Sequence, residues 1–425
     1  MPEPISRGPF SGIPAPREKT SDILNENVTP LLVADVDKIR EAALRAVSPI
    51  KPPDSNAQVR KLLWEVLRTK AGRGLPHYYL VYFLLVELLR FPNLGKFEKI
   101  AWSVPIDFKG TIYLVDHRKF GVGVFCESPD SHEDEAKRIV SLISRGVKVA
   151  DSFFRSLADE AVRQSRVNVK NNSSLLFQRY EHLRDKFHET RAEATARKDE
   201  VKTDIRADQV SGASNPIKLV EHKFPAFKLM REAKWIGIAA IDAFFAWTEH
   251  VFIHLAIIQG RVTTGDEVAG LIGAEWQEKY KQALDITNKD SKRFYDSLGT
   301  LRRQIRNYMA HGAFGKQGEA FSFHSGAGAV PVMLDEIRGM RRFSLSGAAE
   351  FEEQIALSTI EEFIAYLWSG PRRPARTYIQ DADLPLILTF ASDGTYKGAM
   401  QSVKDMERFA HGLVRGFDNA GNMDW

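Results

Sequence analysis

The segment Arg306-Asn307-Tyr308-Met309-Ala310-His311 combines side chains that could cut a phosphodiester without a metal ion. Arginine carries a permanent positive charge on a planar fork that suits phosphate. Histidine exchanges protons near neutral pH. Of the 11 histidines in the chain, His311 is the one with an arginine five to seven residues before it. This pair is therefore the strongest catalytic candidate in the sequence.

RNA could be cleaved at this pair by its own 2′-hydroxyl group, which DNA lacks. His311 would transfer protons, typically worth roughly 10²–10⁴-fold in rate, and Arg306 would stabilise the charge that builds on the phosphate oxygens. In an ideal helix a five-residue offset puts two side chains about 140° apart, so they converge only if the helix ends near Ala310, before Gly312. Asn307 lies one turn before His311 and could orient the imidazole or contact RNA.

The arginine, the adjacent asparagine and the histidine resemble the R-x4-6-H motif of the HEPN superfamily, whose members are often metal-independent ribonucleases. The resemblance covers the motif and the helices around it, about residues 217–370. It implies an antiparallel helical bundle that cuts single-stranded or looped RNA, with no cofactor and no metal ion. It also implies a homodimer, because this chain has one copy of a motif that usually works in pairs, and a role as a toxin or in antiviral defence.

Two other interpretations remain open. A catalytically silent HEPN-like bundle could bind protein or RNA as a scaffold, or the helices could form a regulatory protein unrelated to HEPN. Arg306 could pair with a carboxylate, and His311 could interact with the dipole at the helix C-terminus. A nuclease requires both side chains to be accessible on one cleft, whereas a scaffold allows either to be buried.

Composition limits the other classes of function. The 425 residues allow two or three domains, and 44% hydrophobic residues can build their cores. A net charge of +4 is too balanced for a protein that coats DNA, so any RNA contact depends on a local patch. Cys126 is the single cysteine, which excludes an internal disulfide and a thiolate-rich metal site. With no signal peptide recognised at the start, we expect a cytoplasmic protein.

One apolar stretch, Trp235–Ile258, is long enough to cross a membrane. It carries Asp242 and Glu249, each costing about 2.5–3.5 kcal/mol at a bilayer centre. We therefore expect a buried helix and no membrane association. One of these carboxylates could hold Arg302 or Arg306 in position, although a purely structural ion pair within the bundle is the more ordinary explanation.

The chain as a whole is expected to be mainly α, with four parts. Residues 1–30 predict a flexible arm, and 31–206 a mixed α/β domain that senses a trigger or binds a regulatory partner. In that domain we expect a small antiparallel sheet between helices. The predicted strands are Ile100–Val104, Thr111–Val115 and Gly121–Phe125, and the predicted helices are Val33–Val47, Gln58–Arg68, Pro76–Arg90, Glu135–Gln164 and Ser174–Val201.

A linker at Asp208–Pro216 is expected to lead into the HEPN-like antiparallel bundle of residues 217–370. Thr264 and Glu267 have the spacing of a capping box. The predicted helices are Phe227–Gly260, Thr264–Ile286, Lys289–His311 and Ser346–Trp368, with an irregular stretch at Ala313–Val332. Residues 371–425 are expected to form a hairpin, Leu384–Phe390 with Tyr396–Met400, and a last helix.

Three further motifs could carry chemistry. His250 and His254 have the spacing of a helical zinc pair, but Val251 stands where a zinc protease has glutamate, so a histidine pair that is either at the surface or satisfied by hydrogen bonds is favoured. The basic run Arg372–Arg376 predicts a solvated linker rather than an RNA clamp. The polar run Asp116–Lys119 predicts a turn.

Overall fold

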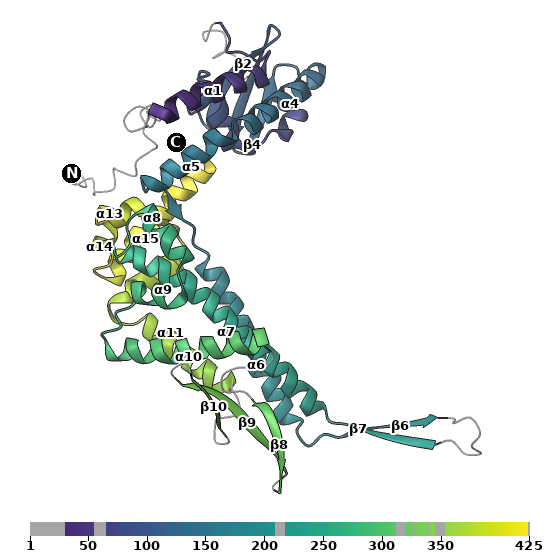
Figure 1. The fold of residues 1–425 in the computed structure, drawn as a ribbon. Coiled ribbons are helices and arrows are strands. Elements are labelled where there is room, and N and C mark those ends of the chain that lie inside the picture. The colour runs from purple at the N-terminus through teal and green to yellow at the C-terminus, as the bar shows by residue number, and fades with distance from the viewer. Residues whose placement is uncertain are drawn as a thin grey trace, which may run out of the picture. The chain divides into compact units, whose positions relative to one another are not determined.

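The computed structural model describes residues 30–54, 65–208, 217–311, 319–326, 328–337, 340–344 and 353–423. The side chains at 30–34, 205–219, 307–323 and most of 327–352 lie outside this description. The fold is mainly helical with a small four-stranded antiparallel sheet (Figure 1). The chain forms two compact units. Unit 1 comprises 1–163 and 411–425, and unit 2 comprises 164–410.

Unit 1 is built on an antiparallel sheet with strand order β1-β4-β3-β2. The three strands expected from the sequence are confirmed, and each pairs with its neighbour as a meander. The β2–β3 turn is tight because Lys109 and Gly110 both have positive φ, at 56° and 88°, as a two-residue hairpin turn requires. The elements of unit 1 are α1 (Pro30–Val47), β1 (Leu67–Arg68), η2 (Ala71–Gly74), α3 (Tyr78–Tyr82), η3 (Phe83–Leu88), β2 (Ile100–Phe108), β3 (Thr111–Arg118), β4 (Gly121–Cys126), η4 (Pro129–Ser131), α4 (Glu133–Val149) and α5 (Asp151–Arg163).

One face of this sheet packs against helices α1, α4 and η3 to form the main core of unit 1. The apolar residues of α4 recur at helical spacing, with Ala136, Ile139 and Ile143 fully buried. The long helix predicted from Glu135 to Gln164 is wrong in one respect, because the chain divides it at Ala150 into α4 and α5.

The predicted helix Gln58–Arg68 differs from the structure at its end. Residues 55–64 lie outside the described residues, and Leu67–Arg68 form strand β1, which pairs with Phe125 and Cys126 of β4. A short apolar run cannot be assigned to helix or strand by periodicity alone. Here Leu67–Arg68 form a strand because they pair with the edge of β4. The predicted arm, 1–30, also lies outside the described residues apart from Pro30.

Unit 2 is dominated by the antiparallel pair α6 and α7 (Figure 1). Its elements are β5 (Asn168–Val169), α6 (Ser173–Ala196), β6 (Lys202–Asp208), β7 (Ile217–Lys223), α7 (Pro225–Ile258), α8 (Gly265–Gly273), α9 (Trp276–Ala283), α10 (Lys289–His311), β8 (Glu319–Ser325), β9 (Gly328–Ile337), β10 (Met340–Ser344), α11 (Glu353–Leu367), η5 (Gly370–Arg372), α12 (Arg373–Arg376), η6 (Thr377–Asp381), β11 (Leu386–Ile387), α13 (Leu388–Ser392) and α14 (Thr395–Ala399). Helix α15 (Val403–Asn422) begins in unit 2 and ends in unit 1.

Helix α7 is the one described helix long and apolar enough to cross a membrane. Its most apolar window is 67% buried inside the protein, as is usual for the core helix of a globular domain. Trp247, Phe244 and Phe252 on this helix are completely buried, and Trp247 packs against Phe177 of α6 with ring centroids 4.7 Å apart. The expectation of a buried helix is therefore met.

Four predictions for the second half of the chain are wrong. The single helix expected at Thr264–Ile286 is divided at Ala274 and Glu275 into α8 and α9. The segment Asp208–Pro216, expected as a linker between domains, joins the paired strands β6 and β7, and the compact units divide elsewhere, at 163/164 and 410/411. The stretch Ala313–Val332, expected to be irregular, contains strands β8 and β9 of a three-stranded antiparallel sheet with β10. The expected C-terminal hairpin is replaced by helices α13 and α14, while β11 pairs with the distant β5.

Candidate functional site

Helix α10, which carries the Arg306–His311 motif, is held in unit 2 by one apolar face. Phe294, Leu298, Leu301 and Ile305 are all at least 93% buried, which confirms the predicted core stripe over the described part of the helix. Phe294 packs against Phe363 of α11, with ring centroids 5.4 Å apart. Because this face is buried, the opposite face of α10 is presented to solvent.

An arginine-lined groove of about 520 Å³ follows the exposed face of α10. Arg302, Arg303 and Arg306 line it along one side, and Glu275 and Gln277, at the start of α9, line it from another element. Gly299 also lines the groove, and a side chain there would meet nothing within 4 Å, so the small residue leaves the space open. Positions 299, 302, 303 and 306 recur every three or four residues, which places them on one helical face.

Arg302 is fixed within this groove by Glu249 of α7. The Glu249 carboxylate accepts a hydrogen bond from Arg302 Nη2 at 2.5 Å and one from Lys279 Nζ of α9 at 3.0 Å. The ion pair within the bundle that the sequence favoured is present at Glu249; of the pairings considered with Arg302 or Arg306 it is the one with Arg302 that forms, whereas Asp242 is exposed. One carboxylate therefore joins three helices and holds two cations beside the groove.

Arg306 lines the groove and is exposed. No hydrogen bond or ion pair joins its guanidinium to any other residue that the structure describes. Arg303 likewise makes no ion pair with a described residue. Two acidic residues also line the groove, and one of them, Asp296, is paired with Lys292 at 2.5 Å. The two unpaired arginines are thus available to bind an anion such as a phosphate.

The other two motif residues, Asn307 and His311, belong to α10 by their backbone, but their side chains lie outside the described residues. The helix is continuous through His311 and does not end before it. Positions 306 and 311 are therefore about 140° apart around the helix axis, and the helix alone does not bring them together. Positions 307 and 311 share a face.

The histidine pair of α7, His250 and His254, makes hydrogen bonds to the backbone within unit 2. His250 Nε2 accepts the backbone N–H of Asn172 at 2.8 Å, and the ring nitrogens of His254 lie 2.8 and 3.2 Å from the carbonyl oxygens of His250 and Lys170. Burial, together with the smaller effect of the neighbouring His254, lowers the pKa of His250 to about 3. Of the surface or satisfied pair expected from the sequence, the structure shows the satisfied one.

The polar run Asp116–Lys119 was expected as a turn, and this is wrong for Asp116, His117 and Arg118, which belong to strand β3, whereas Lys119 lies in the turn that follows. Asp116 is completely buried in strand β3, and burial raises the pKa of its carboxyl group against the opposing effect of Ser103 and Arg118. His117 stacks on Tyr78 with ring centroids 4.1 Å apart. The run lies inside the sheet because the hydrogen bonds of β3 continue through it to Arg118.

The basic run Arg372–Arg376, expected as a solvated linker, is helical in η5 and α12. Arg372 is half-buried, donates from Nε to Leu367 O at 2.9 Å and from Nη2 to Tyr366 O at 2.7 Å, and lies over the Tyr366 ring. No sequence signal distinguished Arg372 from its exposed neighbour Arg373, because the burial depends on the end of α11.

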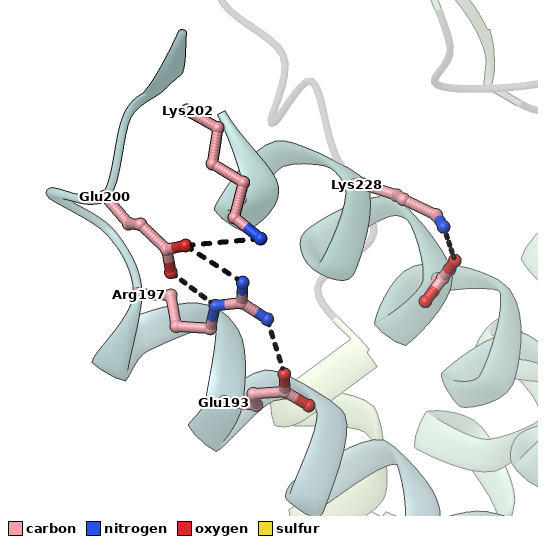
Figure 2. Close-up of polar contacts among 6 residues, drawn as sticks. Glu193, Arg197, Glu200, Lys202 and Lys228 are labelled. Atoms are coloured by element: carbon pink, nitrogen blue, oxygen red, sulfur yellow. Dashed lines mark hydrogen bonds and ion pairs between the residues drawn. The ribbon is translucent and has the colours of Figure 1, made fainter. Parts of the chain in front are cut away.

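A second cluster of cations, at the end of α6, is neutralised by neighbouring carboxylates (Figure 2). Arg197 bonds to Glu193 at 2.9 Å and to Glu200 at 2.6 Å, and Lys202 lies 3.7 Å from Glu200. Figure 2 also shows Lys228 paired with a carboxylate on α7, that of Glu232 at 3.7 Å. Because each cation has a carboxylate partner, this cluster is a weaker phosphate site than the groove on α10.

Comparisons with models of protein families, with curated proteins and with solved structures found no match. The resemblance to HEPN proteins therefore depends on the motif of α10 and on the helices that surround it.

Proposed function

We propose that unit 2 is a HEPN-like, metal-independent endoribonuclease whose RNA-binding surface is the arginine-lined groove of α10. The observation that carries the proposal is the exposed guanidinium of Arg306, which has no ion pair with any described residue, in a groove with Arg302 and Arg303. Positions 302, 303 and 306 place three positive charges within about one turn of helix. Such a row suits the backbone of single-stranded or looped RNA, whose phosphates can adopt the geometry for in-line attack.

In this proposal Arg306 stabilises the charge on the phosphate oxygens, while His311 transfers protons to and from the reacting oxygens. Asn307 orients the imidazole or contacts RNA. Arg302, held by Glu249, positions the phosphate backbone of the RNA substrate. Because one helix separates positions 306 and 311 by about 140°, the proposal includes a homodimer that brings Arg306 of one copy toward His311 of the other across a two-fold axis.

The experiment is cleavage of a single-stranded RNA oligonucleotide by the full chain and by Arg306→Ala and His311→Ala. Arg293→Ala is the matched control, because Arg293 lies on the same helix outside the groove and pairs with Glu362. We expect both motif variants to lose cleavage and the control to keep it. Products should carry a 2′,3′-cyclic phosphate and a 5′-hydroxyl, EDTA should not inhibit, and DNA of the same sequence should survive. Full activity of His311→Ala, strict Mg²⁺ dependence or cleavage of DNA would overturn the mechanism.

The alternative is a scaffold that binds RNA or protein without cutting. The same experiment separates the two, since a scaffold binds RNA through the groove but cleaves nothing in any variant. Light scattering at micromolar concentration tests the dimer, and a monomer with undiminished cleavage would count against it. A cytoplasmic toxin or antiviral effector, with unit 1 as the part that responds to a trigger, is the biological setting that the proposal implies.

A further inference from the structure

Unit 2 contains a second cavity, of about 750 Å³, that is separate from the arginine-lined groove. It lies among the end of α7, the α9–α10 connection, the end of α11 and helices α13 and α14, of which α9, α13 and α14 can be followed in Figure 1. This volume falls within the range of sites that enclose small organic ligands, roughly 300–1,000 Å³. The cavity is therefore large enough for a ligand of nucleotide size.

The charged lining of this cavity is mainly positive. Arg261, Arg372 and Lys397 line it, against one carboxylate, Asp285, so three positive charges minus one negative charge leave an excess of two. Asp285 accepts hydrogen bonds from the backbone N–H of Thr287 at 2.9 Å and from its hydroxyl at 2.8 Å. The carboxylate is thus engaged in its own turn, and it makes no ion pair with the three cations among the described residues.

Two of these cations are held in place before any ligand arrives. Arg372 uses Nε and Nη2 to bond the carbonyl oxygens at the end of α11 and stacks over Tyr366, with its guanidinium carbon 4.6 Å from the ring centroid. Of its five N–H donors, three remain for a ligand. Arg261 is anchored by one hydrogen bond, from Nη1 to Gln282 O at 3.1 Å. Donors fixed in this way lose little side-chain entropy on binding an anion.

Part of the remaining lining is apolar and comes from the core, beside polar residues such as Gln259 and Gln401. Ile258, Leu284 and Tyr396 line the cavity and are at least 99% buried. The Tyr396 hydroxyl accepts the backbone N–H of Ile387 at 2.8 Å, so its polar end is already bonded within the protein. A ligand therefore meets a charged part and an apolar part, which a bare inorganic anion would not fill.

We infer that this cavity binds a small phosphorylated organic molecule of nucleotide size, with the phosphate at Arg372, Arg261 and Lys397. The inference is independent of RNA cleavage, because no cavity residue lines the groove of α10. The cavity also reaches Asn288, whose side chain accepts the backbone N–H groups of Asp290 and Ser291 and so caps α10. A bound ligand would accordingly contact the first turn of the helix that carries the motif.

The test is isothermal titration calorimetry of the full chain with ADP, adenosine and inorganic phosphate. Lys397→Glu is the informative variant, because Lys397 is exposed and its side-chain ammonium makes no hydrogen bond among the described residues. Lys404→Glu is the matched control, an exposed lysine outside the cavity with the same change of charge. Arg303→Glu is a second control for binding in the groove. Circular dichroism checks that each variant is folded.

We expect ADP to bind, and Lys397→Glu to weaken it by about tenfold or more, since reversing one charge near a phosphate changes the interaction by two charge units. Lys404→Glu and Arg303→Glu should leave the affinity within about twofold, and adenosine and phosphate should each bind at least about tenfold more weakly than ADP. No binding of ADP at millimolar concentration would overturn the inference. So would an unchanged affinity in Lys397→Glu, a loss in Arg303→Glu, or binding of adenosine or phosphate as tight as that of ADP.

Discussion

Replacing Glu249 by glutamine should destabilise unit 2 because it leaves a buried lysine without its partner. Glu249 is shared between Arg302 at 2.5 Å and Lys279 at 3.0 Å. The side chains of Glu249 and Arg302 are 32% and 29% exposed, so solvent screens that pair. The Lys279 side chain is only 6% exposed, so its ammonium group depends on Glu249 for compensation.

The magnitude follows from these exposures. Removing one partner of a fully buried ion pair costs about 3–5 kcal/mol, whereas an exposed pair contributes about 0–1 kcal/mol. With one buried and one screened cation, we expect Glu249→Gln to lower the free energy of unfolding of unit 2 by about 2–3 kcal/mol. Lys279→Met, which replaces the buried cation with an apolar side chain of similar length, should cost only about 0–1 kcal/mol.

Urea unfolding followed by circular dichroism and tryptophan fluorescence measures both values. Trp276 is a local reporter, because its ring packs on Phe245, and the Arg302 guanidinium lies 6.0 Å from the Phe245 ring centroid. The double variant Glu249→Gln/Lys279→Met should be more stable than Glu249→Gln alone, since it removes the uncompensated charge. A double variant less stable than Glu249→Gln, or Lys279→Met costing as much as Glu249→Gln, would refute the reasoning.

Three other predictions concern the fold. Thr264→Ala removes the capping box of α8 and should lower the free energy of unfolding by about 1 kcal/mol in urea titrations, whereas a change under a few tenths would show that the cap is dispensable. Gly72→Ala places a Cβ 2.4 Å from the backbone nitrogen of Val124 and should lower the thermal midpoint of unit 1. The control Gly74→Ala should leave the midpoint unchanged, because its Cβ meets only a methyl group at 3.6 Å. Equal midpoints for the two variants would contradict this reasoning. Burial lowers the pKa of His250 to about 3, so between that value and about 6.5 the unfolded state binds the extra proton and stability falls as the pH falls. His250→Gln should flatten this dependence between pH 6.5 and 5 in urea titrations, and an unchanged slope would refute the assignment.

Local patterns in the sequence were reliable where one element decides its own structure. The four-and-three spacing of Phe294, Leu298, Leu301 and Ile305 predicted the buried face of α10, and all four are buried. The Thr264–Glu267 spacing predicted a capping box that is present in full. The strands β2, β3 and β4 were also predicted, because β-prone runs separated by turn residues specify a meander through local contacts alone.

Patterns failed where a distant segment supplies the partner. Leu386–Ile387 became a strand by pairing with Asn168–Val169, more than 200 residues earlier, and the rest of the expected hairpin became helical. Asp116 was expected in a turn, but the sheet continues through it and buries it. In both cases the information lies in a contact between remote parts of the chain, which no local window contains.

For the candidate site, the sequence by itself determined the chemistry that is available. It placed Arg306, Asn307 and His311 at the end of one amphipathic helix. That placement follows from the residue types and the helical periodicity alone, without any contact to another part of the chain. Only the tertiary structure decided which charges are free. It paired Glu249 with Arg302 and Lys279, left Arg306 in a groove with no ion pair to any residue that the structure describes, and bonded Arg372 to the end of α11 beside a second cavity. The physical reason is that a charge is neutralised or left available by the groups that folding brings within a few ångströms of it, and those groups come from other helices.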